Sequence, residues 1–248
     1  MKILTLAAAF AALSMTPATA LDFDNLSEAE RSAFRAEVRA YLLDNPEVII
    51  EAVEQLESRQ AQDQAAQDAA LVSANAEDIF DDGYSWVGGN PDGDITLVEF
   101  MDYRCGYCRR AFPEVEELIA SDGNIRLIVK EFPILGEDSM LSSRFAVAVK
   151  QMEGDDAYKS AHDALMTLKS EVTPTALERL ADNLGMDANA ILEHMDSPEV
   201  TEEIRQTRAL AQRLQITGTP TFVMEDQLLR GYLPLDNMRA LVAQKRQD

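Results

Sequence analysis

The sequence of 248 residues is poor in cysteine and in positive charge. It contains two cysteines, and lysine and arginine together number 22 against 44 aspartates and glutamates, which gives a formal net charge of −22. Nucleic-acid binding requires a basic surface, so this composition argues against a nucleic-acid partner. No stretch after the N-terminal segment is apolar over the length that a membrane-spanning helix needs. With so few cysteines, disulfide staples cannot be the source of the fold's stability.

Both cysteines lie in one motif, Cys-Gly-Tyr-Cys at residues 105–108. An apolar run rich in β-branched and aromatic residues predicts a buried strand over 95–100, and a helix is predicted over 109–120. The thiols are then at a strand-to-helix turn, where unpaired N–H groups and the helix dipole favour a thiolate. We predict that Cys105 is the attacking sulfur and that Cys108 closes a disulfide with it. Such a pair is a two-electron thiol–disulfide switch.

Two other roles of this motif are less consistent with the sequence. A closed zinc site needs four ligands, and the two histidines, His162 and His194, are not at a metal-ligand spacing from the cysteines. An inert structural disulfide would close a very small loop and would contribute little stability. We expect both histidines to be ordinary surface or packing residues, and we expect neither a metal nor a cofactor.

Residues 1–20 have the features of a secretory signal peptide. Lys2 supplies the charge, residues 3–13 a short apolar core, and residues 18–20 an Ala-x-Ala cleavage site. We therefore predict an exported mature chain that starts near Leu21, and a periplasmic location in a bacterium. An oxidising compartment would use additional cysteines as staples. Their absence suits a catalyst of disulfide exchange, because no other thiol can trap its intermediates.

Residues 21–75 differ from the rest of the chain, since they lack glycine, lysine and cysteine and have a helical pattern. Ser27 and Glu30 match a capping box, and Asp-Asn-Pro at 44–46 predicts the start of a second helix. After Arg59 the apolar pattern decays, which fits either a solvated helix or a flexible linker. Two roles for the apolar stripe stay open: packing on the main domain, or self-association through parallel helices, which we favour.

The remaining chain alternates strands and helices. Strands over 95–100 and 125–131, joined by the helix, form a predicted βαβ unit with parallel strands. Residues 139–214 are predicted to form a succession of helices. The other predicted elements are an edge strand over 84–87, a hairpin with strands over 221–224 and 228–232, and a final helix over 235–242.

Several separate motifs resemble those of the DsbA family of thioredoxin-fold proteins. The matching segments are EFMDYRCGYC (99–108), VKEFPIL (129–135) and TGTPTF (217–222). With a helical leader that contains LLDNPEVI (42–49), the chain is similar to the ScsC-like subgroup. The resemblance implies an α/β, DsbA-like thioredoxin fold over 76–248 with a helical insertion over 139–214. A signal peptide (1–20) and an N-terminal α-helical oligomerisation or linker region (21–75) would precede it.

The resemblance also implies roles for four residues at the turn. Cys105 would be the nucleophile and Cys108 the resolving thiol. Pro220 would follow a cis peptide bond and lie against the disulfide, whereas an ordinary trans turn proline is the alternative. The backbone of Thr219 would pair with an extended client peptide.

Glu99 lies inside the apolar strand that precedes the motif, where a carboxylate is costly without a partner or a function. It matches a buried acid of the family, and we expect it to transfer a proton for Cys108 during exchange. A solvent-facing charge at a sheet edge is the alternative. Lys130, at the end of the next strand, is the expected partner of Glu99.

The Gly-Tyr dipeptide between the cysteines, and the threonine before the cis-proline, are similar to the catalytic loops of the disulfide isomerase DsbC. They differ from DsbA itself, which has Pro-His between its cysteines. We interpret the protein as an exported thiol–disulfide oxidoreductase that acts on protein disulfides, with isomerase activity favoured. A DsbA-type dithiol oxidase and a Cu(I)-binding copper-tolerance protein stay open as alternatives. The expected partners are client proteins, a membrane redox partner (DsbD-like for an isomerase, DsbB-like for an oxidase), and further copies of the chain, for which a trimer is one arrangement.

Overall fold

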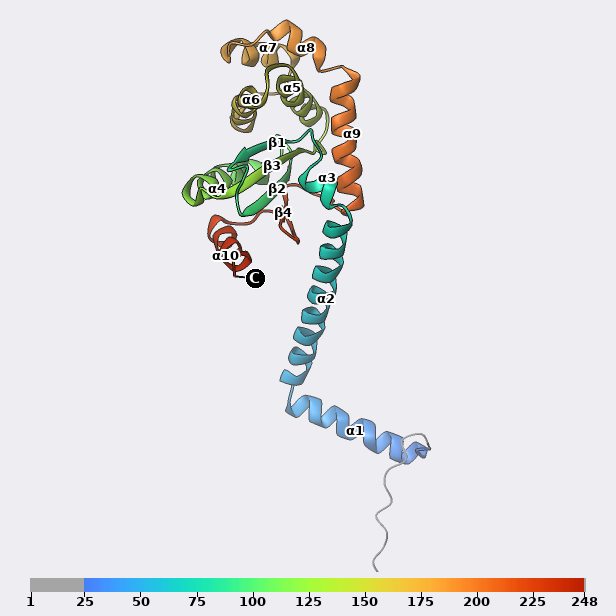
Figure 1. Ribbon diagram of the computed structural model, residues 1–248. Coiled ribbons are helices and arrows are strands. Elements are labelled where there is room, and N and C mark those ends of the chain that lie inside the picture. The colour runs from blue at the N-terminus through green and yellow to red at the C-terminus, as the bar shows by residue number, and fades with distance from the viewer. Residues whose placement is uncertain (1–24, 248) are drawn as a thin grey trace, which may run out of the picture. The chain divides into compact units, whose positions relative to one another are not determined.

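The computed structural model describes residues 25–247, so the predicted signal peptide lies outside the described residues. The chain divides into two compact units, one that ends at Arg59 and one that begins at Gln60 (Figure 1). The first unit contains α1 (Glu28–Asp44) and the beginning of α2 (Glu47–Ala74). Of the two alternatives for the segment after Arg59, a helix is the one observed, because α2 continues without a break to Ala74.

The predicted capping box at the start of α1 is confirmed. The Ser27 hydroxyl accepts the backbone N–H of Glu30 at 3.3 Å, and the Glu30 carboxylate accepts the backbone N–H of Ser27 at 2.9 Å. No residue of α1 is buried in the described chain. Large apolar side chains of this unit are between 41% and 63% exposed: Phe34, Val38, Tyr41, Leu43, Ile49, Ile50, Val53 and Leu56. The apolar stripe that the sequence predicted is therefore exposed to solvent in this unit.

The second unit is organised around one sheet, which in the described residues has five strands in the order β1-β3-β2-β4-β5. They are β1 (Trp86–Gly89), β2 (Ile95–Met101), β3 (Ile125–Glu131), β4 (Thr221–Met224) and β5 (Gln227–Arg230). Strands β2 and β3 are parallel and are joined by α4 (Gly106–Asp122), which confirms the predicted βαβ unit. The other neighbouring pairs are antiparallel.

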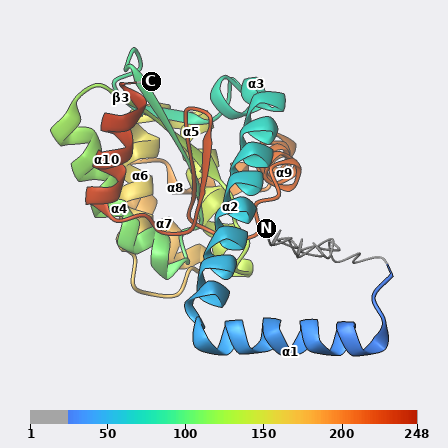
Figure 2. The ribbon, with the colours of Figure 1, turned by 90° about the horizontal axis from the view of Figure 1, so that it is seen from below.

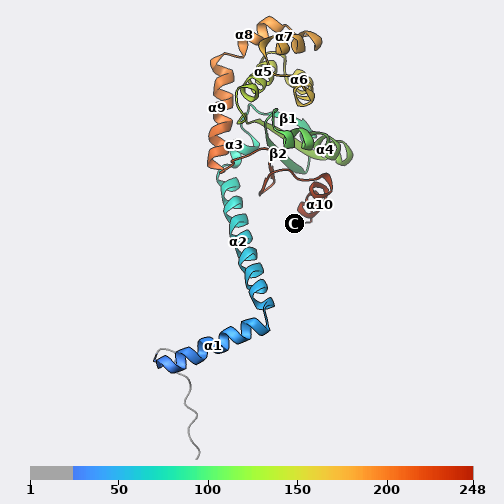
Figure 3. The ribbon, with the colours of Figure 1, turned by 180° about the vertical axis from the view of Figure 1, so that it is seen from behind.

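The helices of this unit cover both faces and one edge of the sheet. They are α3 (Ala76–Phe80), α5 (Glu137–Glu153), α6 (Asp155–Thr167), α7 (Pro174–Asn183), α8 (Ala188–His194), α9 (Pro198–Arg213) and α10 (Leu235–Lys245). Figure 2 shows α4 and α10 on one face, with α3 and α9 on the other. Helices α5 to α8 gather beyond the β1 edge (Figures 1 and 3). This is a DsbA-like thioredoxin fold with an inserted helical block.

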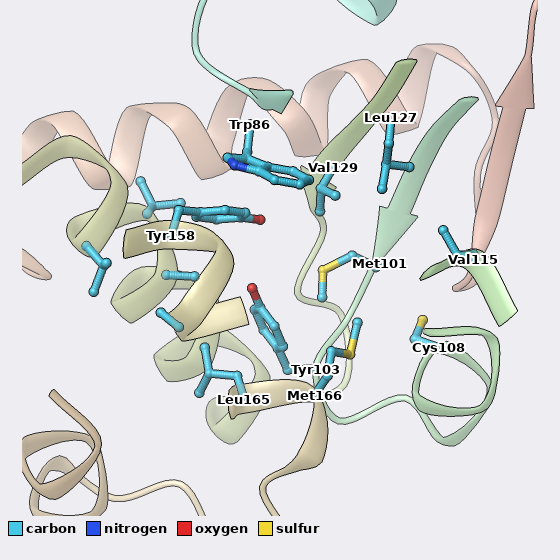
Figure 4. Packing of buried hydrophobic residues seen from close by; sticks show 14 of the residues in the cluster. Trp86, Met101, Tyr103, Cys108, Val115, Leu127, Val129, Tyr158, Leu165 and Met166 are labelled. Atoms are coloured by element: carbon cyan, nitrogen blue, oxygen red, sulfur yellow. The ribbon is translucent and has the colours of Figure 1, made fainter. Parts of the chain in front are cut away.

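Two apolar clusters, one on each face of the sheet, form the core of the second unit. Leu97, Met101 and Val129 belong to the larger cluster, which includes residues of α4, α5 and α6 (Figure 4). Val98, Phe100 and Ile128 belong to the other, with residues of α3 and α9. Because successive strand residues point to opposite faces, a strand buried on both faces reads as a continuous apolar run. That is the pattern of β2 and β3.

Candidate active site

The two cysteines lie where β2 leads into α4. Cys105 is the N-cap residue of α4, with an extended backbone (φ −73°, ψ 119°), and Cys108 is in the first helical turn. The two cysteines are not joined in this structure; Cys105 is 7% exposed and Cys108 is fully buried. The predicted position at a helix N-terminus is confirmed, although α4 starts at Gly106, three residues earlier than the sequence pattern indicated.

The turn that carries Cys105 faces Thr219 and Pro220. The Thr219–Pro220 peptide bond is cis, as the resemblance implied. The sulfur of Cys105 lies 3.1 Å from the Thr219 carbonyl oxygen, which accepts its hydrogen when Cys105 is protonated. The two segments meet because β2 and β4 are neighbours in the sheet, with Phe100 opposite Thr221. Residues far apart in the sequence therefore form one site.

The two sulfurs differ strongly in acidity. The pKa of Cys105 is lowered to about 5, and the hydrogen bond from Cys108 is the largest cause; Thr219 and the backbone N–H groups of Tyr107 and Cys108 add to it, while burial opposes it. The pKa of Cys108 is raised well above its usual range by the hydrogen bond to Cys105, by burial and by the negative charge of Glu99. Near neutral pH the site thus contains one thiolate beside one thiol.

Glu99 lies on β2 among apolar residues and is 3% exposed. Its pKa is raised to about 8, chiefly by burial and then by the nearby charges of Glu116 and Cys105. One carboxyl oxygen, Oε1, has no hydrogen-bond partner within the part of the chain that the structure describes. A carboxyl group that keeps its proton near neutral pH therefore lies close enough to Cys108 to influence its acidity.

The predicted contact between Lys130 and Glu99 is wrong. In the parallel register, Glu99 is opposite Val129 and Lys130 is opposite Phe100, so the two charged side chains point to different faces of the sheet. The ammonium group of Lys130 instead contacts the carboxylate of Asp82 at 2.5 Å and donates to a backbone carbonyl of α3 at 2.9 Å. Lys130 thus ties the segment before β1 to the sheet, away from the cysteines.

Asp102 was missed by the sequence analysis. It is fully buried, and its carboxylate accepts three backbone N–H groups: Arg104 at 2.7 Å, Ile134 at 2.8 Å and Leu135 at 3.1 Å. The Asp102 carbonyl also accepts the N–H of Cys105 at 3.1 Å. One side chain thus fixes the turn before Cys105 to the segment after β3. The signal was present, because an aspartate directly after a strand is a frequent turn-forming residue.

Tyr107, between the cysteines, is the exposed part of the site, with 61% of its surface accessible. Its ring lies 6.3 Å from the ring of Tyr232, and the guanidinium group of Arg110 lies over Tyr232 at 4.5 Å. An aromatic surface therefore lies beside the nucleophile. Such a surface can bind an apolar segment of an unfolded protein chain.

The site contains the groups that thiol–disulfide exchange requires: an acidic thiol, a second thiol held protonated, and a buried proton carrier. Among residues 25–247, no group of three or more histidine, cysteine, aspartate or glutamate side chains could hold a metal ion. The described chain thus offers thiol chemistry at this turn without a preformed metal centre.

Comparison with known families agrees with this geometry. Residues 96–243 match the family described as DSBA-like thioredoxin domain, and residues 30–63 match the one described as copper resistance protein ScsC N-terminal domain. The chain belongs to the DSBA-like thioredoxin domain family, a family of thiol–disulfide oxidoreductases. The resemblance stated from the sequence motifs is confirmed.

Solved structures show the same likeness. A thioredoxin-like oxidoreductase from Silicibacter pomeroyi DSS-3 is 41% identical, with a TM-score of 0.65, and the match covers 69% of this chain and 98% of that one. A linker-deletion mutant of ScsC from Proteus mirabilis is 25% identical, with a TM-score of 0.67, and the match covers 90% of this chain and 97% of that one. The second match extends into the helical leader.

Among curated proteins, the chain is similar to part of the Na⁺/H⁺ antiporter NhaA 3 of Salinispora tropica. The two are 28% identical over 156 residues, which is 63% of this chain and 24% of the antiporter. The chain thus spans about a quarter of the length of that relative. Within the described residues, no helix combines the length and the apolar character needed to cross a membrane.

Proposed function

We propose that the protein is a disulfide isomerase, in which Cys105 attacks disulfides of client proteins and Cys108 is the resolving thiol. The observation that carries the proposal is the asymmetry of the two sulfurs at one turn. The pKa of Cys105 is lowered to about 5, whereas that of Cys108 is raised. A nucleophile that is ionised near neutral pH, beside a thiol that is not, can start an exchange without at once closing its own disulfide.

The reaction proceeds by exchange of sulfur–sulfur bonds. The Cys105 thiolate attacks one sulfur of a client disulfide, so a mixed disulfide forms and the other client sulfur leaves with the electron pair of the broken bond. In isomerisation, a different client thiolate attacks the mixed disulfide and Cys105 leaves as a thiolate. The low pKa of Cys105 makes it a good leaving group, which favours this outcome.

The resolving step requires Cys108 to lose its proton. Cys108 can then attack the sulfur of Cys105, which reduces the client and leaves a Cys105–Cys108 disulfide. We propose that Glu99 is the proton acceptor, since its ionised form is close enough to raise the pKa of Cys108 and its own pKa is raised to about 8. In its ionised form, Glu99 can accept the proton while Cys108 attacks the sulfur of Cys105. Thr219 and Pro220 are proposed to contact the extended client chain.

The exposed apolar stripe of the first unit supports a proposal of self-association. A groove of about 400 Å³ lies between α1 and the beginning of α2, lined by Val38, Leu42 and Ile49 among others. Monomeric soluble proteins rarely expose contiguous apolar surface of this kind. We propose that copies of the chain associate through it, which would present several Cys105 sites to one misfolded client. A trimer is one such arrangement.

An assay with two clients tests the isomerase proposal. We expect the reduced protein to restore a scrambled multi-disulfide protein and to oxidise a reduced client only weakly. Cys105→Ser should abolish rescue and serves as the control for general chaperoning. Strong oxidation of the reduced client with weak rescue would instead support the DsbA-type oxidase.

Deletion of residues 25–59 tests the role of self-association. Residues 60–74 must be retained, because Val72 is buried in the second unit and Asp68 is paired with Arg230 there. We expect the shortened protein to be monomeric by light scattering, to keep the reactivity of Cys105 and to lose rescue of scrambled protein. Full rescue by a monomer would contradict the proposal.

Cu(I) binding is a weaker candidate for the same thiols. A metal ligand must be a thiolate, but Cys108 is held protonated by its hydrogen bond to Cys105, by burial and by Glu99. Titration of Cu(I) against the reduced protein, with Cys105→Ser as control, tests this. A stoichiometric and tight thiol-dependent complex would revive the copper function.

We also propose a periplasmic location and a redox partner in the membrane. The signal-peptide pattern of residues 1–20 and the oxidoreductase family support export. Thiol trapping in cells tests the partner: a mainly reduced motif supports a DsbD-like reductant, and a mainly oxidised one a DsbB-like oxidant. Recovery of the full-length protein with residues 1–20 in the cytoplasm would contradict export.

A further inference from the structure

A second buried carboxyl group, on Glu131 at the end of β3, has no role in the exchange steps above. It is 4% exposed, and its Oε1 atom accepts the hydroxyls of Tyr103 and Tyr158, both at 2.7 Å. Tyr103 belongs to the turn that leads into Cys105, whereas Tyr158 belongs to α6 in the helical insertion. Both tyrosines are buried, and Figure 4 shows their hydroxyls on the inner side of the core cluster.

The directions of these hydrogen bonds form one consistent chain. Both tyrosine hydroxyls donate to Oε1 of Glu131. Burial raises the pKa of Glu131 to about 7, and these two hydrogen bonds oppose the rise because they favour the carboxylate. The oxygen of Tyr103 then remains free to accept from Nδ1 of His162, 3.1 Å away. Burial lowers the pKa of His162 to about 3, so its ring is neutral, and the network assigns its proton to Nδ1. Each hydrogen-bonding group in this network of side chains thus has a definite role as donor or acceptor.

Tyr103, which donates to Glu131 through its hydroxyl, is also held through its backbone. The backbone carbonyl of Tyr103 accepts Nε of Arg109 at 2.6 Å, one helical turn beyond Cys105. The turn before the nucleophile is thus held at the Tyr103 side chain by Glu131 and at the Tyr103 backbone by Arg109. The position of Cys105 relative to the Thr219 carbonyl depends on that same turn.

We propose that Glu131 is a positioning residue for the nucleophile: it holds the Tyr103 hydroxyl and so sets where Cys105 lies against Thr219. This inference rests on the proposed thiol–disulfide exchange at Cys105. The same oxygen also accepts Tyr158, so one carboxylate joins the catalytic turn to the helical insertion. A buried hydrogen bond is suited to this role, because a buried Tyr103 hydroxyl without a partner would be costly.

The two tyrosines provide a matched pair of variants. Tyr103→Phe and Tyr158→Phe each remove one buried hydroxyl bonded to the same oxygen at the same distance. We expect the larger loss of stability in urea unfolding from Tyr103→Phe, because its hydroxyl also contacts Nδ1 of His162. Only Tyr103→Phe should raise the pKa of Cys105, measured by the pH profile of alkylation, and slow mixed-disulfide formation by about tenfold. Tyr158→Phe should change either quantity by less than about twofold.

Substitution of Glu131 supplies the rescue test. Glu131→Leu removes the acceptor and should reproduce the Tyr103→Phe effect on Cys105, while Glu131→Gln keeps an acceptor oxygen and should restore most of it. Ser139→Ala is the control, because Ser139 is fully buried on α5 and its hydroxyl has no partner among the described residues. If Glu131→Leu does not fold, the comparison of Tyr103→Phe with Tyr158→Phe still tests whether Glu131 positions Cys105.

The outcomes distinguish failure of the inference about Glu131 from failure of the proposed exchange at Cys105. Equal and small effects of both tyrosine variants on Cys105, with active wild-type protein, would reduce Glu131 to a structural residue and overturn the inference. A wild-type Cys105 with the reactivity of an ordinary cysteine would refute the proposed function itself.

Discussion

Replacement of Glu99 by glutamine should make the protein more stable and less active. In the folded chain, burial and nearby negative charges raise the pKa of Glu99 from 4.5 to about 8. The unfolded chain releases this proton near pH 4.5, while the folded chain retains it until about pH 8. Stability is therefore lost as pH rises between these values, because the unfolded state binds fewer protons. Glutamine does not titrate, so the variant escapes that loss.

The size of the effect follows from the shift. Each unit of pKa corresponds to about 1.4 kcal/mol, so the stability gained by Glu99→Gln should increase by about 3 kcal/mol between pH 4.5 and pH 7. Above pH 8 the increase should approach about 5 kcal/mol. Burial of the uncharged amide in the Glu99→Gln variant has a cost that is the same at every pH, so this cost cancels when the stability difference is compared between two pH values. Release of the client by Cys108 should slow by about 10²-fold, since the proton acceptor for that step is lost.

Urea unfolding of both proteins at several pH values between 4.5 and 8.5 measures the difference. The disulfide form is used, so that neither thiol titrates and the largest cause of the shift, burial, is retained. A stability difference that stays constant across this range would show that Glu99 does not hold a proton in the folded protein. An unchanged rate of client release by Cys108, followed in a single turnover of the mixed disulfide, would show that Glu99 is not the proton acceptor.

Three further predictions concern other parts of the second unit. Alkylation of Cys105, resolved by mass spectrometry, should rise with pH to a plateau with a midpoint near pH 5; a midpoint near 8.5 would contradict the acidic thiol. Lys130→Met removes the cation that faces the buried Asp82 carboxylate, which keeps its hydrogen bonds from Tyr84 and Ser85, and should cost about 3–5 kcal/mol in urea unfolding without shifting that midpoint. Gly89→Ala should cost at least about 1 kcal/mol by thermal unfolding, because φ is +67° and an added Cβ would lie 2.3 Å from the Ile125 carbonyl. Unaltered stability in either variant would refute the contact described.

Local sequence patterns were sufficient to predict the parts of the site that depend on one stretch of chain. An apolar strand followed by a Cys-x-x-C motif specifies a strand, a turn and a helix, and the cysteines lie there as expected. Pro220 was placed against Cys105 by resemblance rather than by pattern. No rule of spacing links two segments separated by the whole helical insertion.

Lys130 shows where pattern reasoning reaches its limit. Glu99 and Lys130 each lie near the end of a predicted strand, and only the register between the strands decides whether they share a face. The parallel register pairs Glu99 with Val129, and a difference of one residue reverses the face. Register is set by packing across the whole sheet, which neither strand encodes alone.

Glu131 and Asp102 were missed for a different reason. In sequence, each looks like a charge at the end of an apolar run, which is the usual signature of a strand that reaches solvent. Their partners come from elsewhere in the chain: Tyr158 lies on α6, and Ile134 in the loop after β3. A buried polar group is recognisable only when its hydrogen-bond partners are known.

The position of β4 in the sheet has a consequence for folding during synthesis of the protein. Strand β4 pairs with β2, yet the ribosome makes it after the entire helical insertion, close to the C-terminus. Long-range pairing of this kind delays completion of a fold, because the chain between must first be closed into a loop. Until then Cys105 lacks the Thr219 carbonyl beside it. The nascent polypeptide therefore acquires its complete reactive centre only after the helical insertion has been translated.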